Sequence, residues 1–172
     1  MKKCVFFDRD GIVNMRLIGE YITNISAFKL LKGFAELLNY VQQKGYLTIL
    51  ITNQQGIAKG KMTDHDIEVI HKFMQDKLIE FGTKPFDDIY YCPELEVNNP
   101  WRRKPNPGMY IEAIEKWNID VNNSWMIGDV ITDMTSAKKV NLKTILLNVN
   151  IKNVPEADFE VDSHSEIMNI IT

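Results

Sequence analysis

The sequence lacks the features that mark secreted, redox-active or membrane-spanning proteins. Its 172 residues contain only two cysteines, Cys4 and Cys92, which are too few for a disulfide framework and form no C-x-x-C pair. No apolar run approaches the length of a membrane span, and the stretch between Lys3 and Asp8 is too short for the core of a signal peptide. We therefore expect a protein that acts in the cytoplasm.

Charge of one sign is also scarce. The formal net charge is −3, and acidic and basic residues are interspersed along the chain. Surfaces that bind nucleic acids or membranes usually cluster Lys and Arg, so we expect neither partner. The sequence has no internal repeat and no Pro/Gly/Ser-rich linker, which predicts one domain over residues 1–172. A monomer is the expected state.

Short apolar runs alternate with helical patterns along the chain. The runs that predict buried parallel strands cover residues 4–7, 46–52, 89–92, 124–127 and 143–147. Between them, apolar residues recur three and four apart, as at 34–41 and 67–78, and Thr63 predicts a helix N-cap. The alternation predicts an α/β fold: a Rossmann-like, doubly wound parallel sheet in a three-layer sandwich. Residues 158–172 should add an edge strand and a closing helix.

Acidic residues follow two of these strands. Asp8 and Asp10 come directly after the first strand, and Asp129 follows the fourth, with Asp133 four residues further on. The carboxyl ends of parallel strands meet at one edge of the sheet, so these side chains should lie close together. Carboxylates are ligands that Mg2+ prefers. The sequence thus predicts Mg2+ held by Asp8, Asp10 and Asp129, with Asp133 in support.

Groups that suit a phosphate follow elsewhere. Thr52 and Asn53 end the second strand and offer a hydroxyl, an amide and backbone N–H groups, while Lys104 offers a positive charge before a proline. These parts favour phosphoryl transfer: Asp8 attacks as nucleophile and forms an aspartyl-phosphate, and Asp10 serves as acid and base. Thr52 and Lys104 would hold the phosphate oxygens.

The order of these motifs resembles the haloacid dehalogenase (HAD) superfamily over the span from Phe6 to Asp133. Residues 7–14, 52–58 and 103–109 are similar to the subfamily that contains heptose-bisphosphate phosphatases and histidinol-phosphatases. The resemblance implies a phosphatase that hydrolyses phosphomonoesters of small metabolites, with D-glycero-D-manno-heptose 1,7-bisphosphate as the first substrate to test. It also implies that a large cap domain is absent.

The resemblance extends to single residues. It implies Asp8 as nucleophile and a magnesium site formed by Asp8, Asp129 and the backbone carbonyl of Asp10. It further implies substrate contacts from Asn53, Gln54, Arg103 and, on the flap between Asn14 and Ser26, Tyr21.

Two departures from the subfamily leave the substrate open. Its structural zinc is bound by Cys-x-His and Cys-x-Cys, whereas here only Cys92 remains, with Glu94 in place of the histidine and residues 99–102 in place of the second pair. We therefore expect no structural zinc. Val130 stands where heptose-bisphosphate phosphatases have a lysine.

Three alternatives remain open at this point. The first is an enzyme for histidinol phosphate or another small phosphate, for which acidic residues such as Glu94 or Glu96 near the site would be favourable. The others are a phospho-receiver domain and an inactive scaffold. The histidines His65, His71 and His164 have no partner at metal-ligand spacing, and we expect them on the solvated surface.

Overall fold

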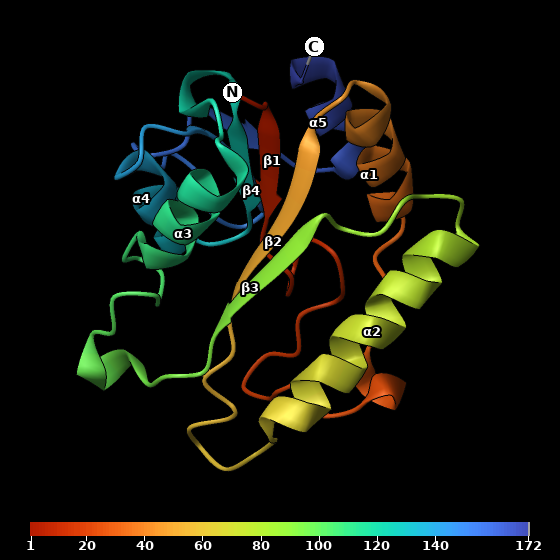
Figure 1. Cartoon of the computed structure of the whole chain (residues 1–172), viewed down its shortest axis with the longest axis vertical. Coiled ribbons are helices and arrows are strands. Elements are labelled where there is room, and N and C mark those ends of the chain that lie inside the picture. Colours follow the sequence, from red (N-terminus) through yellow and green to blue (C-terminus); the bar gives the residue numbers. More distant parts are fainter. Residues whose placement is uncertain (172) are drawn as a thin grey trace.

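The computed structural model describes residues 1–171 and contains a six-stranded sheet in the order β3-β2-β1-β4-β5-β6 (Figure 1). The strands are β1 (Cys4–Phe7), β2 (Leu47–Asn53), β3 (Asp88–Cys92), β4 (Trp125–Gly128), β5 (Lys143–Leu147) and β6 (Phe159–Val161). Every neighbouring pair is parallel. Since the chain builds outward from β1 first toward β3 and then toward β6, the switch point lies between β1 and β4. Ligands of such sheets bind at the carboxyl ends of these strands.

Helices cover both faces of the sheet. They are α1 (Phe34–Gln43), α2 (Asp64–Glu80), α3 (Gly108–Trp117), α4 (Ile131–Lys138) and α5 (His164–Ile170), with short 3-10 helices η1 (Ile25–Ala27), η2 (Glu96–Asn98) and η3 (Val121–Asn123). Figure 1 shows α1 and α2 on one side of the strands and α3 and α4 on the other. The predicted three-layer α/β sandwich is confirmed, including the edge strand and helix in the tail. Thr63 caps α2 as expected, because its Oγ1 accepts a hydrogen bond from the Asp66 backbone N–H at 3.1 Å.

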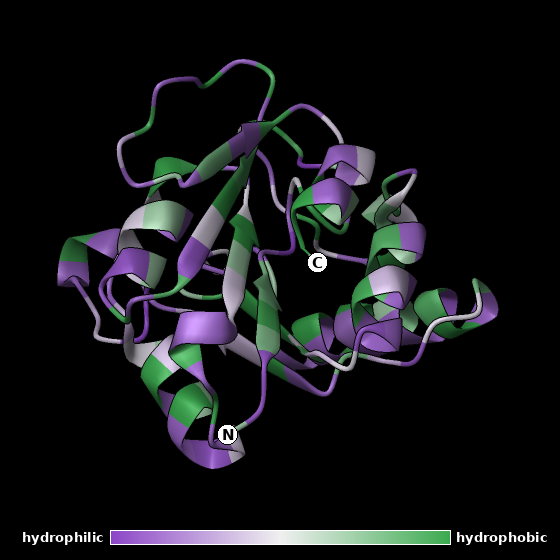
Figure 2. Cartoon of the chain, turned by 90° about the horizontal axis from the view of Figure 1, so that it is seen from above, coloured by the Kyte–Doolittle hydropathy of each residue, from purple (hydrophilic) through white to green (hydrophobic). Residues whose placement is uncertain are grey.

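The strands divide their side chains between two cores. In β1, Val5 and Phe7 pack toward α1, α2 and α5, whereas Cys4 and Phe6 pack toward α3 and α4. This alternation follows from the two-residue period of a strand whose faces are both covered. In Figure 2 the central strands are largely hydrophobic while the helices carry both hydrophobic and hydrophilic residues. The two cores fix β1 and therefore the start of the loop that follows it.

No separate domain is inserted between the loop that follows β2 and the loop that carries Lys104. The interval from Gly56 to Arg103 holds α2, β3 and η2, which agrees with the expected lack of a large cap domain. Within residues 1–171, no helix combines the length and the apolar character that crossing a bilayer requires.

The prediction that all histidines lie on the surface is wrong for two of them. His71 is 7% exposed and His164 is 8% exposed, whereas His65 is exposed. His71 lies one helical turn after Ile67 on the buried face of α2. The Nε2 atom of His164 lies 2.8 Å from the carbonyl oxygen of Ile12, which satisfies the buried ring.

The aromatic cluster beneath β1 generates a stability prediction. Phe34 is fully buried and its ring packs against Phe7 at 5.5 Å and Phe86 at 6.1 Å between centroids. Replacing it (Phe34→Ala) leaves a cavity and should lower the free energy of unfolding by about 3–5 kcal/mol. The control Phe81→Ala removes a phenylalanine that is 66% exposed, and it should cost less than about 1 kcal/mol. Urea unfolding of the two variants measures both values, and equal losses would contradict the assignment of this cluster to the core.

Candidate active site

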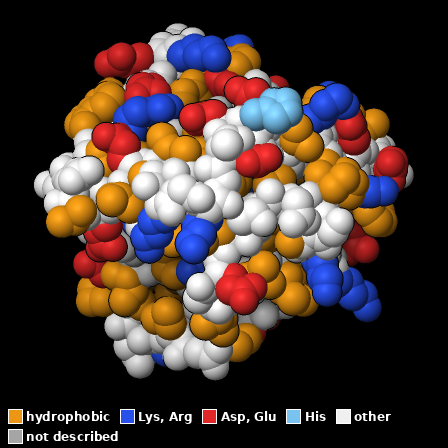
Figure 3. All heavy atoms as spheres, turned by 90° about the horizontal axis from the view of Figure 1, so that it is seen from below, with side chains coloured by type: hydrophobic (Ala, Val, Ile, Leu, Met, Phe, Trp, Pro, Cys, Tyr) orange, Lys and Arg blue, Asp and Glu red, His pale blue; other side chains and the backbone are white. Residues whose placement is uncertain are grey.

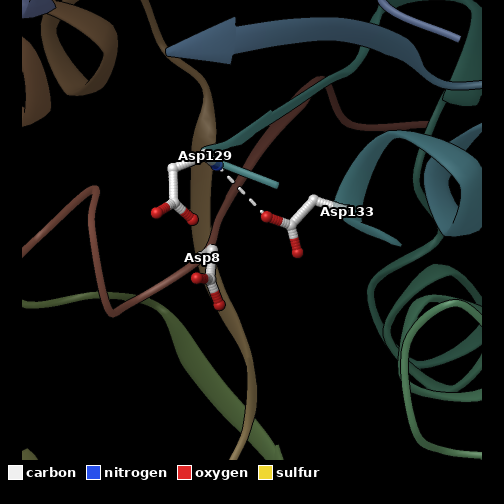
Figure 4. A group of neighbouring side chains, drawn as sticks. All are labelled: Asp8, Asp129 and Asp133. Carbon is white, nitrogen blue, oxygen red and sulfur yellow. Dashed lines mark hydrogen bonds between the residues drawn. The ribbon is translucent and has the colours of Figure 1, made fainter. Parts of the chain in front are cut away.

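Three carboxylates converge at the carboxyl edge of the sheet. Asp8 follows β1, Asp129 follows β4, and Asp133 lies in the first turn of α4. One oxygen from each lies within 4.8 Å of the others, and Figure 4 shows the carboxylates facing a common space. The backbone at Gly11 has φ of 100°, and a side chain there would collide with the Asp129 carboxylate. Glycine thus permits the close approach of the two loops.

Lys104 binds two of these carboxylates. Its Nζ lies 2.7 Å from Asp8 Oδ1 and 2.7 Å from Asp133 Oδ1, and it donates to the Ile51 carbonyl at 2.8 Å. The side chain is 3% exposed. Burial alone would lower the pKa of Lys104, but the charges of Asp133 and Asp8 raise it, so the ammonium stays charged. Three acceptors satisfy its three N–H donors.

Asn53 holds the backbone of Lys104 in place. Its side-chain amide donates to the Lys104 carbonyl at 2.9 Å and its Oδ1 accepts from the Lys104 backbone N–H at 3.1 Å. The end of β2 therefore fixes the loop that carries the lysine.

One cation and two amides bind the Asp10 side chain. It pairs with Arg9 at 3.0 Å and accepts hydrogen bonds from Asn14 at 2.9 Å and Gln54 at 3.0 Å. Burial would raise the pKa of Asp10, but the Arg9 charge and the hydrogen bonds from Asn14 and Gln54 hold it below its ordinary value. Since the side chain is engaged there, Asp10 faces the carboxylate group with its backbone carbonyl.

Sequence reasoning missed the role of Arg9 and His71. Arg9 is 1% exposed, and beyond Asp10 it donates to Gln54 Oε1 at 3.2 Å and lies 3.4 Å from His71 Nε2. Burial and the Arg9 charge lower the pKa of His71 to about 3, so the ring is neutral and Nε2 accepts. The place of His71 on the apolar stripe of α2 was a usable signal, whereas nothing in Asp8-Arg9-Asp10 indicated that Arg9 points inward.

The oxygens implied as magnesium ligands meet at one cation, Arg16. Its Nη2 lies 2.9 Å from the Asp10 carbonyl oxygen, 2.7 Å from Asp129 Oδ1 and 3.7 Å from Asp8 Oδ2. These hard oxygens, arranged around a positive charge, are the donor set that Mg2+ takes in proteins. Asp133 is already engaged, since its Oδ2 accepts from the backbone N–H of Asp129 at 3.2 Å and its Oδ1 binds Lys104. Asp133 therefore positions Lys104 and the backbone of Asp129.

Burial raises the pKa values of both Asp8 and Asp129. Burial raises the pKa of Asp8 to about 6, although Lys104 opposes the shift. Burial and the neighbouring Asp8 and Asp133 raise the pKa of Asp129 to about 8, although Arg16 opposes the shift. Like charges in a buried space hold protons, and a bound cation would release them.

A cavity of about 640 Å³ opens over the site, a volume that suits a small metabolite. Figure 3 looks onto this face, where basic side chains lie together near the middle. Besides Asp8, Asp10 and Lys104, the expected residues that line the cavity are Tyr21, Thr52, Asn53, Gln54, Arg103 and Asp133. Asp129 instead borders a neighbouring cavity of about 590 Å³.

The residues expected to contact substrate differ in whether their side chains are already bound to other residues. Gln54 spans from Asp10 to Thr52, whose Oγ1 accepts from its amide at 2.9 Å, so its side chain is engaged within the site. Arg103 is 8% exposed and donates to the Glu94 carbonyl at 3.3 Å, and its buried Nε has no hydrogen-bond partner among the described residues. A buried guanidinium with a spare donor suits an anion. Tyr21 lies on the flap with its ring close to Gly56.

The raised pKa of Asp129 predicts how stability changes with pH. Without metal, the folded protein keeps a proton that the unfolded chain loses near pH 4, so stability should fall as pH rises from about 4 to about 8. In EDTA, the melting temperature of Asp129→Asn should decline less over this range than that of the unmodified protein. The control Asp76→Asn alters an exposed carboxylate of α2 and should keep the original slope. Identical slopes in all three proteins would contradict the proposed protonation.

Comparisons with known proteins identify the family of this chain. A family model described as HAD-hydrolase-like matches residues 101–169. The D-glycero-beta-D-manno-heptose-1,7-bisphosphate 7-phosphatase of Pasteurella multocida is 34% identical, covering 99% of this chain and 97% of its own. The D-glycero-alpha-D-manno-heptose-1,7-bisphosphate 7-phosphatase of Campylobacter jejuni is also 34% identical, covering 97% and 94%.

Among solved structures, the D,D-heptose 1,7-bisphosphate phosphatase of B. bronchiseptica, complexed with magnesium and phosphate, shares the fold with a TM-score of 0.90. It is 23% identical, and the match covers 98% of this chain and 97% of that one. With relatives of this identity along almost its whole length, the chain belongs to the HAD-like hydrolases, in the family of the heptose-1,7-bisphosphate 7-phosphatases.

Proposed function

We propose that this chain is a Mg2+-dependent phosphatase that removes one phosphate from D-glycero-D-manno-heptose 1,7-bisphosphate. The observation that carries the proposal is the placement of Asp8: a buried carboxylate at the floor of the cavity, 2.7 Å from the Lys104 ammonium and beside the oxygens of Asp10 and Asp129. The relatives' names supply the substrate and point to its 7-phosphate.

In the first step, an oxygen of Asp8 attacks phosphorus while Asp10 gives a proton to the departing sugar oxygen. Bound Mg2+ would supply positive charge that offsets repulsion between the Asp8 carboxylate and the phosphate. The Lys104 ammonium would place its positive charge beside the phosphate oxygens, and the Thr52 hydroxyl would donate to one of them. The lowered pKa of Asp10 leaves it ionised in the resting site. An arriving phosphate dianion raises that pKa, so Asp10 gains its proton only when substrate is present.

In the second step, Asp10 has become a carboxylate and takes a proton from water, which attacks the aspartyl-phosphate. Phosphate leaves, and Asp8 is restored. Arg9, Asn14 and Gln54 keep the Asp10 carboxylate in one orientation through both steps.

The charge of the cavity favours a bisphosphate over histidinol phosphate. Arg103 supplies a buried guanidinium at the wall, whereas Glu96 is 79% exposed at the rim, 3.9 Å from Arg103. A second phosphate would find an unused donor there, while the ammonium of histidinol phosphate would meet Arg103. This phosphate contact from Arg103 would not require the lysine that the subfamily carries at the position of Val130.

The receiver and scaffold alternatives fit less well. A receiver accepts one phosphate and needs no acid and base next to its aspartate, whereas Asp10 is held beside Asp8 by three partners. A scaffold would not need Lys104 to be buried among carboxylates.

Phosphate release from a substrate panel tests the proposal. The panel holds the alpha and beta anomers of the heptose bisphosphate, because the relatives differ in the anomer named, together with histidinol phosphate and p-nitrophenyl phosphate. We expect turnover of a heptose bisphosphate that needs Mg2+ and stops in EDTA. Asp8→Asn should lower kcat by about a thousandfold or more.

Two controls sharpen the assay. Asp76→Asn, on the outer surface of α2, should retain full activity. Phosphorus NMR of the product should show which phosphate remains. Preferred turnover of histidinol phosphate would overturn the substrate, and a single equivalent of phosphate per protein would favour a receiver.

We further propose that the chain works as a single-domain monomer in the cytoplasm. One sheet carries every motif, and the two thiols are free and buried, which fits a reducing compartment. Light scattering after size exclusion should give a mass near 19.9 kDa. A mass of twice that value would contradict the monomer.

A further inference from the structure

The guanidinium of Arg16 lies among the acids of the site, although Arg16 belongs to the flap. Nε and Nη2 both donate to the Asp10 carbonyl oxygen, at 3.2 Å and 2.9 Å, and Nη2 also donates to Asp129 Oδ1 at 2.7 Å. Asp8 Oδ2 lies 3.7 Å from the same nitrogen. One side-chain nitrogen thus lies at the meeting point of three oxygens from three different residues.

We propose that Arg16 is a positioning residue for the metal site: it holds the metal ligands together in the metal-free protein, and Mg2+ binds by displacing it. The inference rests on the proposed function only in taking Mg2+ as the cation of this site. Because Nη2 contacts the same oxygens that would bind the metal, the guanidinium and Mg2+ cannot occupy the site together.

The charges of the site explain both the metal-free state, with Arg16 in place, and the state with Mg2+ bound. When ionised, the carboxylates of Asp8, Asp129 and Asp133 face two cations, Lys104 and Arg16, which leaves one negative charge uncompensated. Exchanging a guanidinium for a divalent cation removes that excess. Without either cation the carboxylates would repel one another in a buried space, where charge interactions are poorly screened.

The backbone beside Arg16 is fixed, so the exchange needs only a side-chain movement. The Gly11 N–H donates to the Asn14 carbonyl at 2.8 Å and the Met15 N–H donates to the Lys29 carbonyl at 2.8 Å, which anchors the start of the flap. The Arg16 side chain is 40% exposed and lines the main cavity. Its rotation toward solvent would open Asp129 to that cavity.

Titration of Mg2+ into the protein, monitored by isothermal titration calorimetry, tests the inference without any substrate. Arg16→Gln should bind Mg2+ about tenfold more tightly or better, because the competing charge-assisted contacts are gone. Arg103→Gln removes the same charge from the same cavity without touching the ligand oxygens, and it should change the affinity less than about threefold. Arg16→Lys keeps the charge but loses the planar fork and should fall between the two.

Thermal unfolding supplies a second readout. In EDTA, Arg16→Gln should melt below the unmodified protein, since the carboxylates lose their cation, and saturating Mg2+ should raise its melting temperature by more. Circular dichroism checks that the variant folds.

Two results of the magnesium titration would overturn the inference. An affinity for Arg16→Gln within about threefold of the unmodified protein overturns the inference, and so does an equal gain in Arg103→Gln, which would show a general charge effect. Either result leaves the proposed phosphatase intact. Failure of all the proteins to bind Mg2+ overturns both the inference and the metal dependence of the proposed function.

Discussion

The site depends on one constraint: carboxylates buried together at a sheet edge have to be balanced by cations that reach into the same space. Lys104 meets this constraint by reaching Asp8, Asp133 and the Ile51 carbonyl at once. A buried ion pair is weak support for stability but strong support for geometry, because an unpaired partner is costly. The lysine therefore fixes where Asp8 and Asp133 lie relative to β2.

The same fold gives two aspartates, two residues apart, opposite environments. Asp8 lies against other acids, and burial raises its pKa to about 6, whereas Arg9 and two amides hold the pKa of Asp10 below its ordinary value. A pair whose pKa values are driven apart can divide roles between them. On the Asp10 side this difference comes from the buried guanidinium of Arg9, which pairs with Asp10 at 3.0 Å.

The strand ends were predictable and the long side chains were not. Apolar runs and the acids that follow them placed Asp8 and Asp129 at one edge, because parallel strands end together. The spacing of His71 from Ile67 indicated that His71 lies on the buried face of α2, but this signal was overlooked. No pattern indicates where an arginine ends, since its stem spans several ångströms in many rotamers, and so the sequence did not reveal the contacts of Arg16.

Hydrogen bonds from an amide side chain and the backbone hold the loop before Lys104 in place. Where the resembled subfamily has zinc cysteines, this chain has hydrogen bonds: the Asn106 amide donates to Asn99 Oδ1 at 2.8 Å and to the Pro100 carbonyl at 3.1 Å. The Arg103 N–H donates to the same Pro100 carbonyl at 3.0 Å. These contacts close the loop next to Arg103 and Lys104 and help to hold both cations in position. Amide hydrogen bonds of this kind hold a loop in place while its other side chains can vary, which is how one scaffold accommodates different loops.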